Sequence, residues 1–197
     1  AGIFSAPRLW WMLRAFGHDN VSVLDGGLKA WQTAGGALER GAPTPPVAAA
    51  APFIARLDPE LVLNLESVRA NLDAPADSSI LMVDARSAGR FSGREPEPRA
   101  GLRSGHIPRS VNVPFGTLLD KESGTMLDEA SLRAAFEEAG VAVDSVRSLG
   151  VTCGSGMTAA ILALGLARLG RWDVRLYDGS FSQWGDPAFG APVESDA

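Results

Sequence analysis

The residues best suited to covalent chemistry lie in the segment CGSGMTA, which begins at Cys153, the single cysteine of the 197-residue chain. Cys153 ends the apolar run SLGVTC, and a long helical pattern follows the turn. We therefore expect a parallel strand to pass here into a helix, where α/β proteins commonly place catalytic groups. Backbone N–H groups of residues 154–157 can converge on an anion, and the helix dipole adds to their effect. Both favour a thiolate at Cys153, a nucleophile that could also carry sulfur as a persulfide anion.

Two other interpretations of Cys153 compete with this one. A free cysteine is commonly a small buried apolar residue, but Cys153 ends its apolar run and opens a Gly-x-Gly turn. A cysteine phosphatase loop also joins a strand to a helix, and it needs an arginine six residues after the cysteine to hold phosphate oxygens. That position is Ala159, and residues 154–161 contain no basic residue. The same shortage of cations weakens the case for a dianionic donor such as thiosulfate.

Two arginines could bind an anionic donor. Arg90 and Arg99 stand nine residues apart in GRFSGREPEPR, which glycine and proline prevent from forming one continuous helix. Their side chains can therefore fold toward a common point, where a planar guanidinium group meets a carboxylate with two parallel hydrogen bonds. The alternative for each arginine is an ordinary solvated position on the surface.

Three further polar residues are predicted to be structural. His106 is one of two histidines and could act as a general base. It stands, however, in Gly-His-Ile-Pro before the run SVNVP, a position typical of a residue that anchors a turn. Asp84 and Arg86 end the run ILMVDAR and are expected to connect neighbouring loops by hydrogen bonds.

The elements that would position these residues alternate along the chain. Apolar runs typical of buried strands occupy residues 80–86, 110–114, 148–153 and 174–179. Helical patterns occupy residues 128–140 and 158–170. Such alternation predicts the α/β class, with a mostly parallel sheet covered by helices on both faces.

An internal repeat is visible in the sequence. The segment LRAFGHDNVSVLDGG at residues 13–27 aligns without a gap with LARLGRWDVRLYDGS at residues 166–180, and the same spacing pairs Trp31 with Trp184. Asp-Gly followed at one fixed distance by tryptophan indicates two copies of one domain type. Residues 21–25 are then expected to form a strand, and each tryptophan to pack beneath its own domain.

This repeat and a Pro/Ala-rich stretch predict the domain organisation. Residues 1–38 are interpreted as the C-terminal remnant of a first copy, and residues 39–60 as an extended interdomain linker. Residues 61–197 are interpreted as the catalytic domain.

Composition excludes several classes of function. A net charge of −5 without a clustered basic face argues against partners such as nucleic acid or an anionic membrane. The longest strongly apolar stretch, residues 159–167, is about half the ~20 residues needed to span a bilayer. One cysteine cannot form an intramolecular disulfide or a cysteine-based metal cluster, and this usage suits a reducing, cytoplasmic location.

Four segments resemble the 3-mercaptopyruvate sulfurtransferase family of two-domain rhodaneses. They are CGSGMTA, residues 84–114, DGSFSQWG at residues 178–185 and residues 4–31, so the likeness covers nearly the whole chain. The loop is similar to that family's Cys-Gly-Ser-Gly-Val-Thr, with Met157 in place of valine, whereas thiosulfate-preferring rhodaneses carry basic residues directly after the cysteine. The resemblance implies a rhodanese-like domain with a parallel sheet and helices on both faces.

The resemblance also implies a site and a reaction. It marks Cys153 and Ser155 as catalytic, and it marks a substrate-binding set of Arg90, Arg99, Gly154, Gly156, Met157 and Thr158. The thiolate would take sulfur from 3-mercaptopyruvate, release pyruvate, and pass the sulfur of the persulfide to cyanide or an acceptor thiol, without a cofactor or metal. The alternatives are a thiosulfate sulfurtransferase and a non-catalytic rhodanese-like binding module, although the latter would be expected to have lost Cys153.

Two partners are expected on the same basis. In the family, the loop serine works with a histidine and an aspartate of the N-terminal domain, and neither can be assigned here. We expect both on a missing N-terminal part of the first domain, present as a separate chain. Because a second thiol is lacking in the sequence, a reduced thioredoxin-like protein or a small thiol is expected to accept the sulfur.

Overall fold

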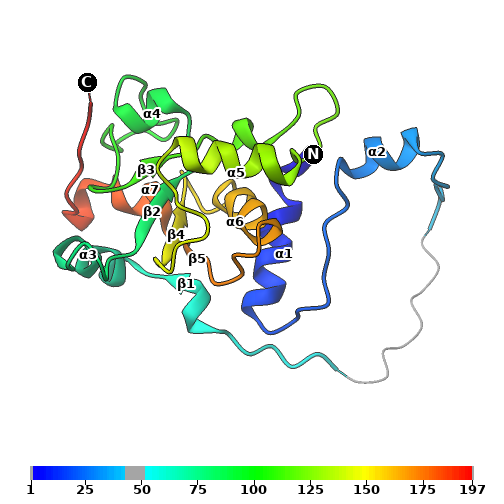
Figure 1. The fold of residues 1–197 in the computed structure, drawn as a ribbon, viewed down its shortest axis with the longest axis horizontal. Helices are drawn as coiled ribbons and strands as arrows, with labels where there is room; N and C mark the ends of the chain where they lie inside the picture. Colours follow the sequence, from blue (N-terminus) through cyan, green and yellow to red (C-terminus); the bar gives the residue numbers. More distant parts are fainter. Residues whose placement is uncertain (1, 43–51, 197) are drawn as a thin grey trace.

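The protein is built on one parallel five-stranded sheet, with strand order β1-β5-β4-β2-β3. A computed structural model describes residues 2–42 and 52–196 (Figure 1). The strands are β1 (Val62–Leu63), β2 (Leu81–Asp84), β3 (Val111–Asn112), β4 (Leu149–Thr152) and β5 (Arg175–Tyr177). Every adjacent pair runs parallel, which confirms the predicted fold class.

The burial of the two central strands, β2 and β4, explains why their sequences are continuous apolar runs. All four residues of β2 and all four of β4 are buried, as expected for a parallel sheet covered on both faces. Asp84 pairs with Thr152 in the register of β2 and β4. Because parallel strands end at the same edge, Asp84 and the cysteine that follows Thr152 lie at one edge of the sheet.

Helices cover the two faces of this sheet and bury two separate clusters of apolar side chains. They are α1 (Ala6–Ala15), α2 (Gly27–Thr33), α3 (Leu65–Asp73), α4 (Ala88–Ser92), α5 (Glu129–Glu138), α6 (Ala159–Arg168) and α7 (Ser180–Trp184), with short 3₁₀ turns at Gly2–Phe4, Pro59–Leu61, Phe115–Leu118 and Pro187–Phe189. Side chains of α1, α5 and α6 pack on one face against Val83 and Val151. Side chains of α3 and α7 pack on the other face against Met82 and Tyr177. This alternation of strand residues between the clusters follows from the two-residue period of a strand.

Side-chain caps fix where two of the helices begin. Asn64 accepts a hydrogen bond from the N–H of Ser67 at 2.8 Å, and the Ser67 hydroxyl accepts one from the N–H of Asn64 at 3.0 Å, so α3 begins with a capping box. Asp128 caps α5 by accepting from the N–H of Ser131 at 2.8 Å. Helices α5 and α6 lie inside the ranges expected from the sequence.

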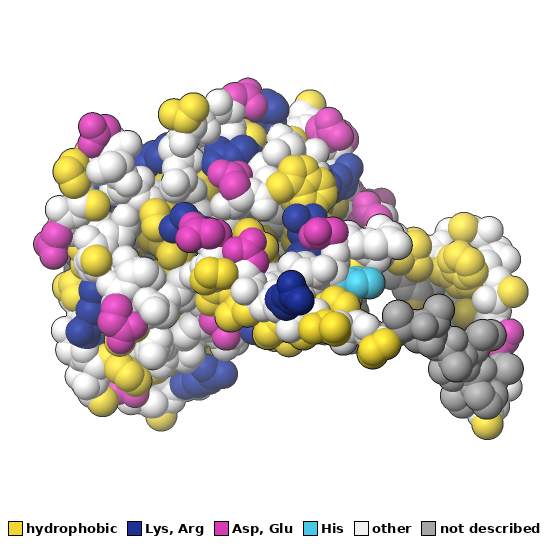
Figure 2. All heavy atoms as spheres, turned by 90° about the horizontal axis from the view of Figure 1, so that it is seen from below, with side chains coloured by type: hydrophobic (Ala, Val, Ile, Leu, Met, Phe, Trp, Pro, Cys, Tyr) yellow, Lys and Arg dark blue, Asp and Glu magenta, His cyan; other side chains and the backbone are white. Residues whose placement is uncertain are grey.

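The N-terminal segment divides into a packed helix and an exposed one. Helix α1 packs on α6, and Trp10 and Ala15 belong to the buried cluster. Helix α2 has no buried residue and stands apart from the sheet (Figure 1). Figure 2 shows apolar side chains on this projecting part, consistent with the exposure of Leu28 and of Trp31 at 43%.

Two expectations for this segment are wrong. Residues 21–25 do not form a strand, because no strand of the sheet in the described part of the chain pairs with them; Val21 and Val23 instead pack as half-buried side chains against the apolar cluster of α1 and α6. Trp184 is fully buried as expected, but Trp31 is exposed, as no residue of α2 is buried. A strand needs a neighbouring strand to pair with, and a short helix needs an apolar surface to cover its side chains.

The predicted linker at residues 39–60 is described only in part. Residues 43–51 lie outside the described residues. Residues 52–58 form neither a helix nor a strand, and the N–H groups of Arg56 and Asp58 donate to the carbonyls of Phe16 at 3.0 Å and Ala15 at 2.7 Å. This stretch therefore runs along the C-terminal end of α1 before the chain enters β1, and the predicted domain boundaries stay predictions. No helix of the described segments is long and apolar enough to cross a bilayer.

Candidate active site

Cys153 lies directly after β4, in the turn that leads into α6, as its sequence predicts. Its side chain is buried, with 2% of the residue exposed, and its Sγ accepts a hydrogen bond from the N–H of Ser155 at 3.4 Å. Gly156 has a φ of +79°, a left-handed conformation that side chains with a Cβ rarely adopt. The sulfur is therefore buried at the end of β4, in contact with a backbone N–H of the turn.

The turn is held in place by contacts from α7. The carbonyl of Cys153 accepts from the N–H of Phe181 at 2.9 Å, and the carbonyl of Gly154 accepts from the N–H of Ser182 at 2.9 Å. Both donors belong to α7, which follows β5 at the same edge of the sheet. The backbone on the N-terminal side of the turn is therefore fixed by the neighbouring strand–helix connection.

A third contact comes from the N-terminal segment. Arg8 of α1 donates from Nη1 to the carbonyl of Gly156 at 3.3 Å and from Nη2 to Asp178 Oδ1 at 2.7 Å. Its guanidinium group also lies 4.8 Å from the ring centre of Trp11. A Cβ placed on Gly156 would stand 2.9 Å from Arg8 Nη1. Glycine at this position therefore allows both the backbone conformation and the approach of Arg8.

The remaining predicted residues of the turn form its exposed side. Ser155 and Met157 are exposed, Met157 by 38%, and Thr158 is half-buried. The Ser155 side chain has no hydrogen-bond partner within residues 2–42 and 52–196. The hydroxyl is thus available to an incoming molecule.

Arg90 is the predicted anion-binding residue that the structure brings to the cysteine turn. It is in α4, which begins where Ser87 accepts from the N–H of Arg90 at 3.4 Å. A Cβ placed on Gly154 would stand only 2.8 Å from Arg90 Nη2. The guanidinium group therefore covers the first residue after Cys153, and its side chain is 24% exposed.

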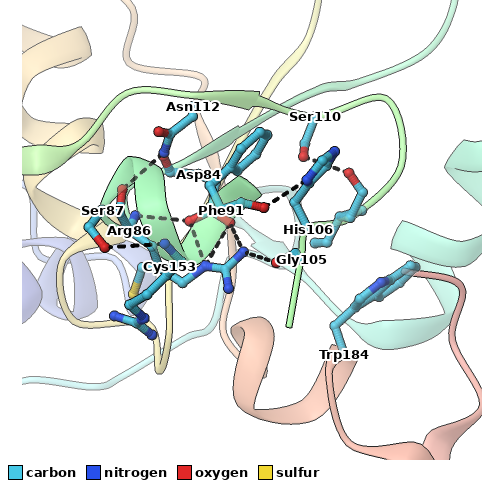
Figure 3. A network of polar contacts seen from close by, with 12 residues as sticks. Asp84, Arg86, Ser87, Phe91, Gly105, His106, Ser110, Asn112, Cys153 and Trp184 are labelled. Atoms are coloured by element: carbon cyan, nitrogen blue, oxygen red, sulfur yellow. Dashed lines mark hydrogen bonds and ion pairs between the residues drawn. The ribbon is translucent and has the colours of Figure 1, made fainter. Parts of the chain in front are cut away.

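Glu97 fixes the orientation of Arg90, and sequence reasoning missed it. Arg90 donates from Nε to Glu97 Oε1 at 3.0 Å and from Nη2 to Oε2 at 2.5 Å, a bidentate pair. Arg86 donates from Nη1 to the same Oε1 at 2.8 Å. Arg86 also donates to both oxygens of Asp84 and to the carbonyl of Gly105. Figure 3 shows Asp84, Arg86 and Gly105 connected in this way beside Cys153. The only sequence signal was an acidic residue in Pro-Glu-Pro between the arginines.

Both members of the Arg90–Glu97 pair stay charged. Burial acts to lower the pKa of Arg90, but the hydrogen bond and charge of Glu97 outweigh it and raise that pKa above its usual value. Burial acts to raise the pKa of Glu97, but the hydrogen bond from Arg90 and the charge of Arg86 hold that pKa below its usual value. The pair is therefore ionic throughout the neutral range.

Arg99 is not brought to the turn. Its side chain is exposed, and it makes no ion pair or hydrogen bond to any other part of the described chain. The proline-rich segment between the two arginines places Glu97, rather than Arg99, next to Arg90. A role for Arg99 at the site stays a prediction.

His106 lies in a structural environment. Its Nδ1 is 2.8 Å from the carbonyl of Phe91, and its ring stacks on the Phe91 ring with centres 4.0 Å apart. The backbone N–H of His106 donates to the carbonyl of Glu194 at 2.8 Å. These contacts join α4 to the C-terminal segment, and Figure 3 shows the imidazole next to Phe91. They support the turn-anchoring role predicted for this histidine.

Comparison with known proteins assigns the family. A family profile described as Rhodanese-like domain matches residues 64–186. The chain belongs to the rhodanese family. The matched residues include every strand from β2 to β5 and the whole turn around Cys153, so the rhodanese-like domain coincides with the sheet and the site described above.

Relatives of this rhodanese-like chain carry sulfurtransferase names. Human 3-mercaptopyruvate sulfurtransferase is 45% identical over 183 residues, covering 93% of this chain and 59% of the human protein. The Thiosulfate/3-mercaptopyruvate sulfurtransferase 2 of Arabidopsis thaliana is 41% identical over 201 residues, covering 93% of this chain and 57% of that protein. The chain thus spans less than two thirds of the length of these relatives.

A solved structure gives the same result. The crystal structure of the Escherichia coli 3-mercaptopyruvate sulfotransferase superposes with a TM-score of 0.73 at 40% identity, over 90% of this chain and 63% of that one. The resemblance to the 3-mercaptopyruvate sulfurtransferase family, predicted from the sequence, is therefore confirmed in both sequence and fold.

Proposed function

We propose that the protein is a sulfurtransferase in which Cys153 carries sulfur as a persulfide and 3-mercaptopyruvate is the donor. The observation that supports this most strongly is a buried cysteine on a strand–helix turn, with the guanidinium of Arg90 directly over Gly154. The names of the relatives point the same way.

The reaction has two half-reactions. The Cys153 thiolate attacks the sulfur of the donor, an S–S bond forms, and the bond between sulfur and C3 breaks. The electron pair of that bond leaves with the pyruvate enolate, which takes up a proton to give pyruvate. In the second half-reaction, cyanide or a thiol attacks the outer sulfur, forms a new bond to it and releases the Cys153 thiolate.

Arg90 has donors free for the carboxylate of the donor. Glu97 occupies its Nε and one N–H of Nη2, which leaves Nη1 and the second hydrogen of Nη2. Arg99 would supply a second cation if its exposed side chain turned toward the site. The loop residues Gly154, Gly156, Met157 and Thr158 would then line the donor, with the Ser155 hydroxyl placed for proton transfer.

Thiosulfate is the second candidate donor, because the Arabidopsis relative is named for both compounds. The absence of a basic residue from residues 154–161 favours 3-mercaptopyruvate, since a dianion at the sulfur calls for cationic partners. Assaying both donors with cyanide as the acceptor separates the two functions. A kcat/KM higher for thiosulfate than for 3-mercaptopyruvate would reject our choice of donor.

Cysteine usage supports the proposed acceptor and location. Cys153 is the one cysteine in these 197 residues, so the sulfur would leave for an external thiol, such as that of a reduced thioredoxin-like protein. A persulfide that must meet reduced acceptor thiols suits the cytoplasm. Comparing a reduced thioredoxin-like protein with small thiols as the acceptor tests this part of the proposal. Release of sulfur without any external thiol or cyanide would reject it.

A further inference from the structure

Glu97 is a buried carboxylate in direct contact with Arg90, the arginine that covers the cysteine turn. Its side chain is 2% exposed, and both of its oxygens accept hydrogen bonds from guanidinium groups. Oε1 accepts from Arg86 at 2.8 Å and from Arg90 at 3.0 Å, and Oε2 accepts from Arg90 at 2.5 Å. Such a carboxylate acts on Arg90 in two ways, since it orients the guanidinium group and it offsets its charge.

The charges around Arg90 are balanced. The network contains two carboxylates, Asp84 and Glu97, and two guanidinium groups, Arg86 and Arg90, joined in the order Asp84–Arg86–Glu97–Arg90. Because the pKa of Glu97 is held below its usual value by its two arginines, this carboxylate stays charged at neutral pH. Arg90 therefore faces the cysteine turn with most of its positive charge compensated.

Neither the turn nor α1 adds a free cation beside the sulfur. Residues 154–161 contain no lysine, arginine or histidine. Arg8 reaches the turn, but it is paired with Asp178 at 2.7 Å. The electrostatic environment of Cys153 thus depends closely on whether Glu97 carries its charge.

We infer that Glu97 is a specificity-determining residue that selects singly charged carboxylate donors over doubly charged ones by compensating Arg90. This inference rests on the proposed sulfurtransferase function. The interaction energy of a donor with a fixed charge is proportional to the charge of the donor. Removing the negative charge of Glu97 therefore lowers the interaction energy of a dianion such as thiosulfate with the site by twice as much as that of a monoanion such as 3-mercaptopyruvate.

A purely structural role for Glu97 predicts a different result. If Glu97 only held Arg90 in place, its replacement would lower kcat/KM for both donors by similar factors. The ratio of the two values separates the roles, because the loss of orientation largely cancels in it while the effect of charge does not. The ratio is therefore the quantity to measure.

The test compares Glu97→Gln with wild type, using cyanide as the acceptor and each donor in turn. We expect the ratio of kcat/KM for thiosulfate to that for 3-mercaptopyruvate to rise by about threefold or more, the factor for one unit charge acting several ångströms away even at high dielectric constant. Glu95→Gln is the matched control, since Glu95 is exposed on the same segment and accepts from the Ser87 hydroxyl at 3.0 Å rather than from Arg90. Its ratio should stay at the wild-type value, as should that of Glu97→Asp, which keeps the charge.

A second variant keeps the test decisive if Glu97→Gln does not fold. Met157→Lys adds one positive charge from the exposed side of the turn, and Met157→Gln is its uncharged control. We expect the lysine variant to raise the same ratio. An unchanged ratio in folded Glu97→Gln, or in Met157→Lys where Glu97→Gln is unfolded, overturns the inference while wild-type activity still supports the proposed function. Wild type without activity on either donor would instead reject the proposed function itself.

Discussion

Arg90 lies so close to Gly154 that a Cβ on that glycine would stand 2.8 Å from Arg90 Nη2. The bidentate pair with Glu97 prevents the guanidinium group from moving aside freely. Arg90 of α4 thus occupies the space that a side chain at position 154 would need, which explains the glycine directly after the cysteine.

Gly154→Ala should consequently displace Arg90 without unfolding the protein. We expect KM for 3-mercaptopyruvate to rise several-fold with a small change in melting temperature, because only the tip of one side chain must move. Gly116→Ala is the control, since a Cβ at Gly116 meets nothing within 4 Å. Steady-state kinetics and thermal unfolding of both variants check this, and an unchanged KM in Gly154→Ala would contradict the contact.

Arg90→Ala should lower kcat/KM for 3-mercaptopyruvate by about 10- to 150-fold, the loss of one charge-assisted hydrogen bond worth roughly 1.5–3 kcal/mol. Arg99→Ala should act in the same direction if Arg99 turns in when the donor binds. Arg94→Ala is the control for both, because Arg94 is an exposed arginine of the same segment. Kinetics indistinguishable from wild type in Arg90→Ala or Arg99→Ala would remove that arginine from the site.

Arg8 links the N-terminal helix to the cysteine turn, and its removal should lower kcat. Arg8→Met loses the bond to the Gly156 carbonyl and the ion pair with Asp178. The partner Asp178 is largely exposed, so we expect at most about 1 kcal/mol of destabilisation. A double-mutant cycle with Asp178→Asn should show non-additive effects on kcat. Additive effects would mean that the two residues act separately.

The lowered pKa of Glu97 predicts a pH dependence of stability. Because the pKa of Glu97 in the folded protein lies below its usual value of 4.5, this carboxyl group releases its proton more readily when folded. Its contribution to stability is therefore complete above the unfolded-state pKa and is lost as the pH falls through the folded-state pKa. The stability difference between wild type and Glu97→Gln should shrink under acidic conditions below pH 4.5. Chemical unfolding at neutral and acidic pH measures this difference, and a constant difference would contradict the ion pair.

Features encoded by neighbouring residues could be predicted from the sequence. The apolar run ending at Cys153, the two glycines and the following helical pattern are local signals, and they placed the turn, β4 and α6 correctly. The parallel sheet followed from the alternation of such runs with helical patterns. These signals depend on periodicity and turn chemistry within about 20 residues.

Contacts between distant residues could not be predicted in this way. Arg8 and Gly156 are 148 positions apart, and nothing in either segment indicates the other. Glu97 could be any acidic surface residue until the fold places it between Arg86 and Arg90. The error at residues 21–25 has a related cause, since a strand pattern specifies an element only where the fold supplies a neighbouring strand.

The central claim is that Cys153 itself carries the sulfur. The most direct measurement is intact and peptide mass spectrometry after treatment with 3-mercaptopyruvate in the absence of any acceptor. We expect one added sulfur atom on the peptide that contains Cys153, its loss on addition of cyanide, and none in Cys153→Ser, which should remain folded and have no sulfur transfer activity. Turnover of the donor with no added sulfur on Cys153, or substantial activity in Cys153→Ser, would contradict the proposed mechanism.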